Sequence, residues 1–126
     1  MSELVCLELS VVLWIVHVLI QGGIGNSVFP SGYLATARDQ QLNTGNVYYG
    51  RATRALANYV ENLAPFIALD LGFMATHHPG GFGPTVWIVA RALYIPLYLF
   101  GVPYARTLAW VVSLVGLIMM LVRLAF

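Results

Sequence analysis

The chain has 126 residues, of which 60% are hydrophobic and 9% are charged, and its formal net charge is +1. A soluble domain carries about a quarter charged residues, so this composition excludes a soluble globular enzyme and a disordered segment. The six basic residues are all arginine and form no basic cluster, which excludes a nucleic-acid binder. One membrane span needs about 20 apolar residues. The sequence therefore predicts a small integral membrane protein that crosses the lipid bilayer several times.

Four apolar segments follow one another along the chain. The expected spans are residues 4–21, 47–76, 84–100 and 104–124. The first should end at Gln21-Gly22-Gly23, and the second should begin after the capping signal Asn43-Thr44-Gly45-Asn46 and end at the breaker His77-His78-Pro79-Gly80-Gly81. No segment shows the period-two alternation of a barrel strand. The prediction is one all-α domain over residues 1–126, an integral membrane four-helix bundle.

Arginine placement predicts the orientation of this bundle. The first and third connections and the helix ends beside them hold Arg38, Arg51, Arg54 and Arg106, whereas the opposite side holds only Arg123, interpreted as a snorkelling anchor. Because positively charged connections stay in the cytoplasm, both termini are expected on the far side, and in a bacterium the membrane would be the inner one. The first residues show no signal-peptide pattern, so no cleavable leader is expected. Trp14, Trp87 and Trp110 are interpreted as interfacial anchors.

The second span carries a polar stripe. Arg51, Arg54, Asn58 and Glu61 stand at offsets of 0, 3, 7 and 10, which places them on one helical face. Charged residues within spans cost about 2.5–3.5 kcal/mol each and usually face a bundle interior or a cavity. Two explanations fit: an Arg–Glu network that only joins helices, or a site whose arginines bind a ligand with several carboxylates.

The third and fourth spans add polar residues toward the same membrane side. Arg91, Tyr94 and Tyr98 stand at offsets of 0, 3 and 7 on one face of the third span. Arg106 and Thr107 open the fourth span directly after the turn. Together with the stripe of the second span, they predict an arginine-rich, tyrosine-lined cavity near the cytoplasmic interface that binds a small, multiply charged anion.

These polar segments also carry a resemblance. Residues 51–62 read Arg-Ala-Thr-Arg-Ala-Leu-Ala-Asn-Tyr-Val-Glu-Asn. This run resembles the Arg-Ala-x-x-Asn-x-x-Glu signature of the MAPEG family, the membrane-associated proteins in eicosanoid and glutathione metabolism. Residues 90–98 and the pair Arg106-Thr107 are similar to its third and fourth helices, and residues 33–39 to the first connection of short bacterial members.

The resemblance implies a homotrimer with glutathione, as co-substrate, bound between neighbouring subunits near the cytoplasmic side. Arg106 matches the arginine that stabilises the glutathione thiolate and is the expected catalytic residue. Thr107 falls where a relative has serine, and Arg38 matches an arginine that reaches a glutathione carboxylate. With the polar faces derived above, the expected glutathione-binding residues are Arg38, Arg51, Arg54, Asn58, Glu61, Arg91, Tyr94, Tyr98 and Thr107.

The expected function is a glutathione-dependent transferase or peroxidase acting on lipophilic electrophiles. Two alternatives stay open: a non-catalytic membrane assembly protein of the same fold, and a small four-helix multidrug exporter that uses Glu8 for proton and cation exchange. No metal site is expected, because His77-His78 has no third ligand. Asp70 lies off the polar stripe and is expected to pair between subunits or to lie near the far interface.

Overall fold

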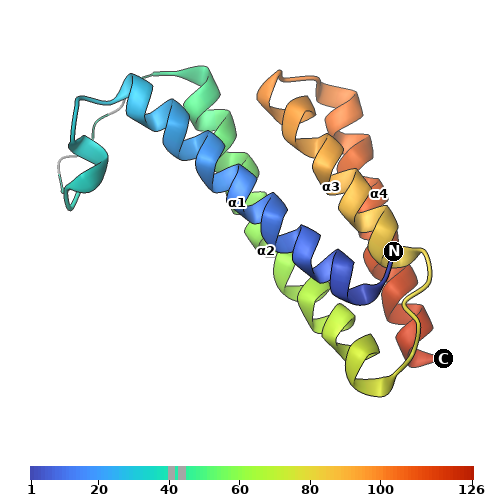
Figure 1. The fold of residues 1–126 in the computed structure, drawn as a ribbon. Helices are drawn as coiled ribbons and strands as arrows, with labels where there is room; N and C mark the ends of the chain where they lie inside the picture. The colour runs from blue at the N-terminus through green and yellow to red at the C-terminus, as the bar shows by residue number, and fades with distance from the viewer. Residues whose placement is uncertain (40–41, 43–44) are drawn as a thin grey trace.

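A computed structural model describes residues 1–39, 42 and 45–126. This part of the chain contains no strand and folds into α1 (Glu3–Val28), the short 3₁₀ turn η1 (Tyr33–Ala35), α2 (Val47–Thr76), α3 (Gly83–Leu99) and α4 (Pro103–Ala125). The hairpin of α1 and α2 packs beside the hairpin of α3 and α4 (Figure 1). The all-α four-helix bundle predicted from the sequence is confirmed.

The first helix is longer than the sequence predicts. α1 continues through Gln21-Gly22-Gly23 and ends at Val28, where the extended Phe29 precedes Pro30. The predicted end at residue 21 was wrong, because a helical glycine costs only about 1 kcal/mol and a helix in lipid keeps its backbone groups hydrogen-bonded within itself. Proline, in contrast, has no N–H and pushes the residue before it out of the helical region.

The second helix begins and ends at local signals. Asn46 caps its start, since its Oδ1 accepts a hydrogen bond from the Tyr49 amide at 2.9 Å. His77, with φ of 55°, ends it in the left-handed region just before Pro79. Asn43 and Thr44, the first residues of the predicted capping signal, lie outside the described residues. α2 continues as one α-helix across Pro65.

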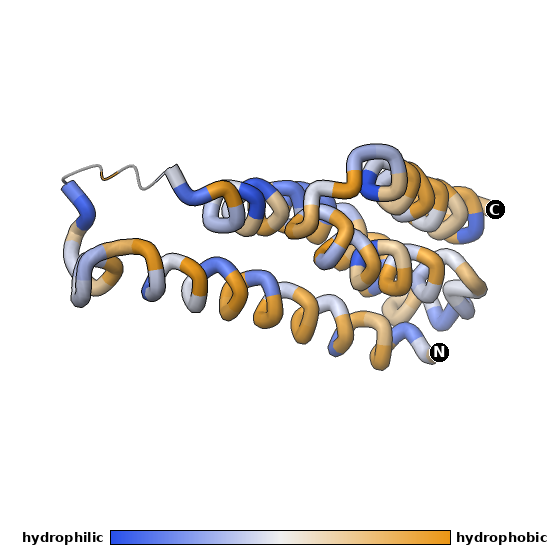
Figure 2. Tube along the Cα trace, turned by 90° about the horizontal axis from the view of Figure 1, so that it is seen from above, coloured by the Kyte–Doolittle hydropathy of each residue, from blue (hydrophilic) through white to orange (hydrophobic). Residues whose placement is uncertain are grey.

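The outer surface of the bundle is apolar. Among the described residues, α1 and α4 are the two helices long and apolar enough to cross a membrane. Figure 2 shows hydrophobic colour along most of both helices, while hydrophilic residues gather where α2 begins. Large apolar side chains such as Leu19 and Leu108 are 67% and 64% exposed. Such a surface is suited to contact with lipid rather than with water.

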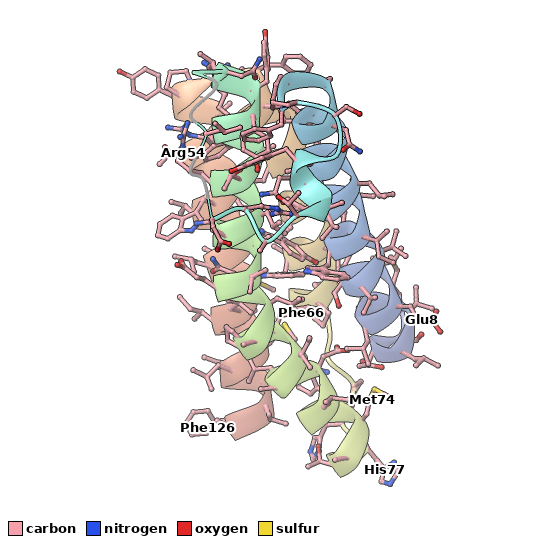
Figure 3. The ribbon with its side chains drawn as sticks, turned by 90° about the vertical axis from the view of Figure 1, so that its left-hand side faces the viewer. Glu8, Arg54, Phe66, Met74, His77 and Phe126 are labelled. Carbon is pink, nitrogen blue, oxygen red and sulfur yellow. The ribbon has the colours of Figure 1, made fainter. Side chains whose placement is uncertain are left out.

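Aromatic side chains fill the centre of the bundle. Tyr59, Phe66 and Phe73 recur every seven residues along α2, are fully buried, and pack with Trp87 of α3. The rings of Phe66 and Trp87 stack with their centroids 4.0 Å apart, and Figure 3 shows Phe66 between the helices. The prediction of Trp87 as an interfacial anchor was therefore wrong, because this side chain lies entirely inside the bundle.

Two glycines bring the backbones of α3 and α4 into contact. A Cβ atom on Gly116 would lie 2.9 Å from the Trp87 amide nitrogen, and one on Gly83 would lie 3.0 Å from the Gly116 carbonyl oxygen. Small residues allow this close approach, which is a main source of helix association in lipid. The contact fixes α3 against α4 and so sets the distance between their polar residues at the other end of the hairpin.

Candidate functional site

The polar faces of three helices meet in one cavity of about 230 Å³. α2 contributes one lining residue, α3 two and α4 three: Asn58, Tyr94, Tyr98, Arg106, Thr107 and Trp110. Tyr94 and Tyr98 of α3 are four residues apart, as are Arg106 and Trp110 of α4, and this spacing places each pair on one helical face. The cavity therefore brings together five of the site residues predicted from the sequence and adds one more.

Arg106 lies in the first turn of α4, directly after the Gly101–Pro103 turn. Its Cζ atom lies 4.8 Å from the ring centroid of Tyr98, so the cation packs against an aromatic face. Within the described part of the chain, its guanidinium donates no hydrogen bond and forms no ion pair. The cavity thus contains a fixed cation whose hydrogen-bond donors are available to an anionic ligand.

Two residues of the polar stripe on α2 also lie at this cavity: Asn58 lines it, and Arg54 contacts its lining residue Tyr98. The Nε atom of the exposed Arg54 donates a hydrogen bond to the Tyr98 hydroxyl at 3.2 Å. The Oδ1 atom of Asn58 is buried and accepts no hydrogen bond from the described residues. A buried acceptor without a donor is unfavourable, and a ligand N–H group in the cavity would satisfy it.

Arg51 lies on the same face of α2, but its guanidinium contacts the end of α3. Its Nη1 atom donates a hydrogen bond to the carbonyl oxygen of Leu99, the last residue of α3, at 3.0 Å. The guanidinium also lies so close to Gly101 that a Cβ there would be 2.7 Å from Nη2. A cation at a helix C-terminus complements the helix dipole. The structure therefore gives Arg51 a contact outside the cavity, which positions the turn before Arg106.

Arg91 is fully buried behind the cavity. Its Cζ atom lies 4.5 Å from the ring centroid of Tyr94 and 5.4 Å from that of Tyr59. None of its three guanidinium nitrogens has a hydrogen-bond partner among the described residues. Arg91 does not line the cavity, and its contact with the site is through the ring of Tyr94.

Two further predicted residues do not line the cavity. Arg38 donates from Nε and Nη2 to the Leu34 carbonyl oxygen at 3.1 and 2.8 Å, within its own loop. Glu61 is exposed on α2, and in the described residues it pairs with neither Arg51 nor Arg54. The Arg–Glu network that would only join helices is thus not formed within this chain.

Trp110 is the cavity residue that sequence reasoning did not assign to the site. It was predicted to be an interfacial anchor, but it lines the cavity together with Arg106 and Thr107. Its position four residues after Arg106 places both on one face of α4, and this spacing was the available signal. Its indole gives the polar cavity one large apolar wall.

The structure also places Glu8, the pair His77-His78 and Asp70. Glu8 is exposed and points away from the other helices (Figure 3), so the structure offers no interior carboxylate of α1 for the exporter alternative. The described residues contain no group of three potential metal ligands, and His77 ends α2. Asp70 is fully buried inside the single chain, and neither of its oxygens has a hydrogen-bond partner there. The expectation that Asp70 pairs between subunits was therefore wrong, because the side chain is enclosed within one chain; its position near the far membrane interface stays a prediction.

These features define a small polytopic membrane protein with one arginine- and tyrosine-lined cavity at an end of a four-helix bundle. The family model described as MAPEG family matches residues 5–126, nearly the whole chain. The chain therefore belongs to the MAPEG family, which includes membrane glutathione transferases and related enzymes. No curated protein and no solved structure matches it.

Proposed function

We propose that this protein is a glutathione-dependent transferase or peroxidase acting on lipophilic electrophiles in the membrane. The observation that carries the proposal is the Arg106 guanidinium, which lines the cavity without a hydrogen-bond partner among the described residues. Tyr94, Tyr98 and Thr107 add hydroxyl groups around it, and apolar helices surround the site. This is a suitable place to hold a thiolate next to a substrate dissolved in lipid.

The proposed role of Arg106 is to stabilise the glutathione thiolate. A free thiol has a pKa of about 8.5, and a cation in contact lowers a pKa by about 1–3 units. The thiol releases its proton to solvent, and the thiolate sulfur then forms a bond with the electrophilic carbon while the leaving group departs with its electron pair. The bilayer concentrates the electrophile beside the sulfur, which lowers the entropic part of the barrier.

The remaining polar residues are proposed to bind the peptide portion of glutathione. Asn58 offers a buried, unpartnered acceptor to an N–H group. Arg54 is held beside the cavity by Tyr98 and can donate its remaining hydrogen bonds to a carboxylate. Glu61 lies three residues after Asn58, about one helical turn along the same face of α2, and its carboxylate can accept a hydrogen bond from the ammonium group of glutathione. For Arg38, Arg51 and Arg91, direct contact with glutathione stays a prediction.

The size of the cavity supports a homotrimer with a shared site. Small-molecule sites have volumes of about 300–1,000 Å³, whereas this cavity has about 230 Å³. Arg54 and Glu61 lie exposed on α2 beside it. A neighbouring subunit placed against this side of α2 would enlarge and close the site. We propose that the end of the bundle that carries the site faces the cytoplasm, with both termini on the opposite side.

Calorimetric titration with glutathione in detergent tests the proposal. We expect wild-type protein to bind glutathione, and Arg54→Ala to bind it about ten- to hundredfold more weakly, the effect of losing a hydrogen bond to a charged group. Arg123→Ala, at the other end of the bundle, is the matched control and should bind like wild type. Absence of binding by wild type would overturn the enzymatic proposal. Binding without turnover of any lipophilic electrophile would favour the non-catalytic alternative.

A further inference from the structure

A second cavity, of about 820 Å³, lies at the end of the bundle opposite the candidate site. One wall is the backbone and side chains of residues 78–83, the loop between α2 and α3. The other wall is the carboxyl-terminal half of α4, where Val115, Ile118, Met119 and Val122 line it. Figure 3 shows His77 and Phe126 at this same end. We call this space the far groove.

Arg123 stands at the polar end of the far groove in a defined orientation. Its Nε atom donates a hydrogen bond to the Pro79 carbonyl oxygen at 2.6 Å. The side chain also lies against Gly81, where an added Cβ would be 3.1 Å from Nε and 3.4 Å from Cζ. These contacts hold the guanidinium, while neither Nη atom has a hydrogen-bond partner in the described part of the chain. Two donors are thus available beside an apolar groove.

The charge of the far groove favours an anion. No aspartate or glutamate lines it, and His78 lies at its rim together with Arg123. Glu3, the first residue of α1, lies against this loop, and its carboxylate accepts a hydrogen bond from the Gly80 amide. That bond directs the Glu3 carboxylate to the backbone of the loop. An anionic group next to Arg123 would therefore meet the Nη donors, while the Glu3 carboxylate that contacts the loop is hydrogen-bonded to the Gly80 amide.

We infer that the far groove binds an anionic phospholipid, with the phosphate on the Arg123 Nη atoms and an acyl chain along Val115, Ile118 and Met119. Arginine binds phosphate through two parallel hydrogen bonds. α4 is apolar and long enough to span the bilayer, so its last turn lies at head-group depth. The groove volume falls within the range of small-molecule sites, about 300–1,000 Å³.

Native mass spectrometry of the full chain in detergent tests this inference, with phosphatidylglycerol as the probe and phosphatidylcholine as its zwitterionic comparison. We expect tighter retention of phosphatidylglycerol. Arg123→Gln should weaken it about ten- to hundredfold, the effect of losing hydrogen bonds to a charged group. Val115→Trp should fill the groove and abolish retention. The matched control, Val111→Trp, places the same side chain on an exposed position of α4 outside the groove and should bind like wild type.

Three results would overturn the inference. The first is equal retention of both lipids by the wild type. The second is equal weakening by Val115→Trp and Val111→Trp, which would indicate general lipid contact rather than a groove. The third is unchanged lipid binding with an altered oligomeric mass in Val115→Trp, which would show a second copy of the chain in the groove. Arg123→Gln should keep wild-type glutathione binding, so the outcome is independent of the proposed function.

Discussion

Replacing Arg106 by glutamine should move the pH profile of catalysis more than it lowers the rate at neutral pH. In the structure the Arg106 guanidinium lines the cavity, 4.8 Å from the Tyr98 ring centroid, and has no hydrogen-bond partner among the described residues. A thiolate bound there would be its main electrostatic contact. A pKa lowered by two units, within the usual range of about 1–3, raises the thiolate fraction at pH 7 from roughly 3% to about 75%, starting from a free thiol near 8.5.

The gain in rate is smaller than the gain in thiolate. Nucleophilicity falls with pKa along a Brønsted slope of about 0.4–0.5, so a two-unit drop makes each thiolate roughly eightfold less reactive. The net advantage of wild type at pH 7 is therefore about threefold. Above the pKa of the free thiol both proteins hold thiolate, and the Arg106→Gln variant should then be several-fold faster than wild type. The two profiles should cross.

The assay is kcat against pH with a lipophilic aryl halide at saturating glutathione, together with thiolate absorbance in the ultraviolet. We expect the midpoint of both curves to rise by about two units in Arg106→Gln. Arg123→Gln removes the same charge at the far end of the bundle and should leave both midpoints unchanged. An unshifted midpoint in Arg106→Gln would show that this arginine does not act through the thiolate.

Three further variants test other parts of the structure. Trp110→Ala removes the apolar wall of the cavity and should raise KM for bulky electrophiles several-fold while binding of glutathione stays constant in calorimetry. Asp70→Asn should stabilise the protein by about 1–3 kcal/mol, seen as a higher Tm in detergent, because the buried carboxylate has no hydrogen-bond partner in the described residues; a lower Tm would reveal a partner for the carboxylate. Gly116→Ala should destabilise it by about 1–3 kcal/mol, since its Cβ would meet the α3 backbone. Gly22→Ala, with open space around it, is the control and should be neutral or stabilising.

The sequence predicted a helix boundary correctly where the local signal acts directly on backbone hydrogen bonds, and wrongly where the signal only weakens a helix. Asn46 and the turn beginning at His77 could be recognised because capping and proline both act on the nearest backbone groups. Gln21-Gly22-Gly23 was misread as an end, since glycine weakens a helix without removing a hydrogen bond. The helix ended instead at Val28, two residues before Pro30, which lacks an N–H.

Side-chain spacing predicted which residues share a face but not how far each one reaches. Arg51 and Arg54 lie on the same face of α2, yet the first contacts the end of α3 and the second contacts Tyr98. Arg91 is one turn before Tyr94, yet it is buried against the Tyr59 ring on α2. These differences come from the rotation of α3 relative to α2, which no single-helix pattern contains.

The sequence by itself determined that this is an all-α membrane bundle, because composition and apolar run length depend on each segment's own contact with lipid. It also predicted ten site residues from the polar face of each helix and from the family resemblance, and the structure brings five of them into one cavity: Asn58, Tyr94, Tyr98, Arg106 and Thr107. The tertiary structure alone decided that Trp110 closes the cavity, that Trp87 lies in the core and that Arg123 faces a groove. Those outcomes depend on the contact of α3 with α4 through Gly83 and Gly116, which is set by backbone approach between distant segments.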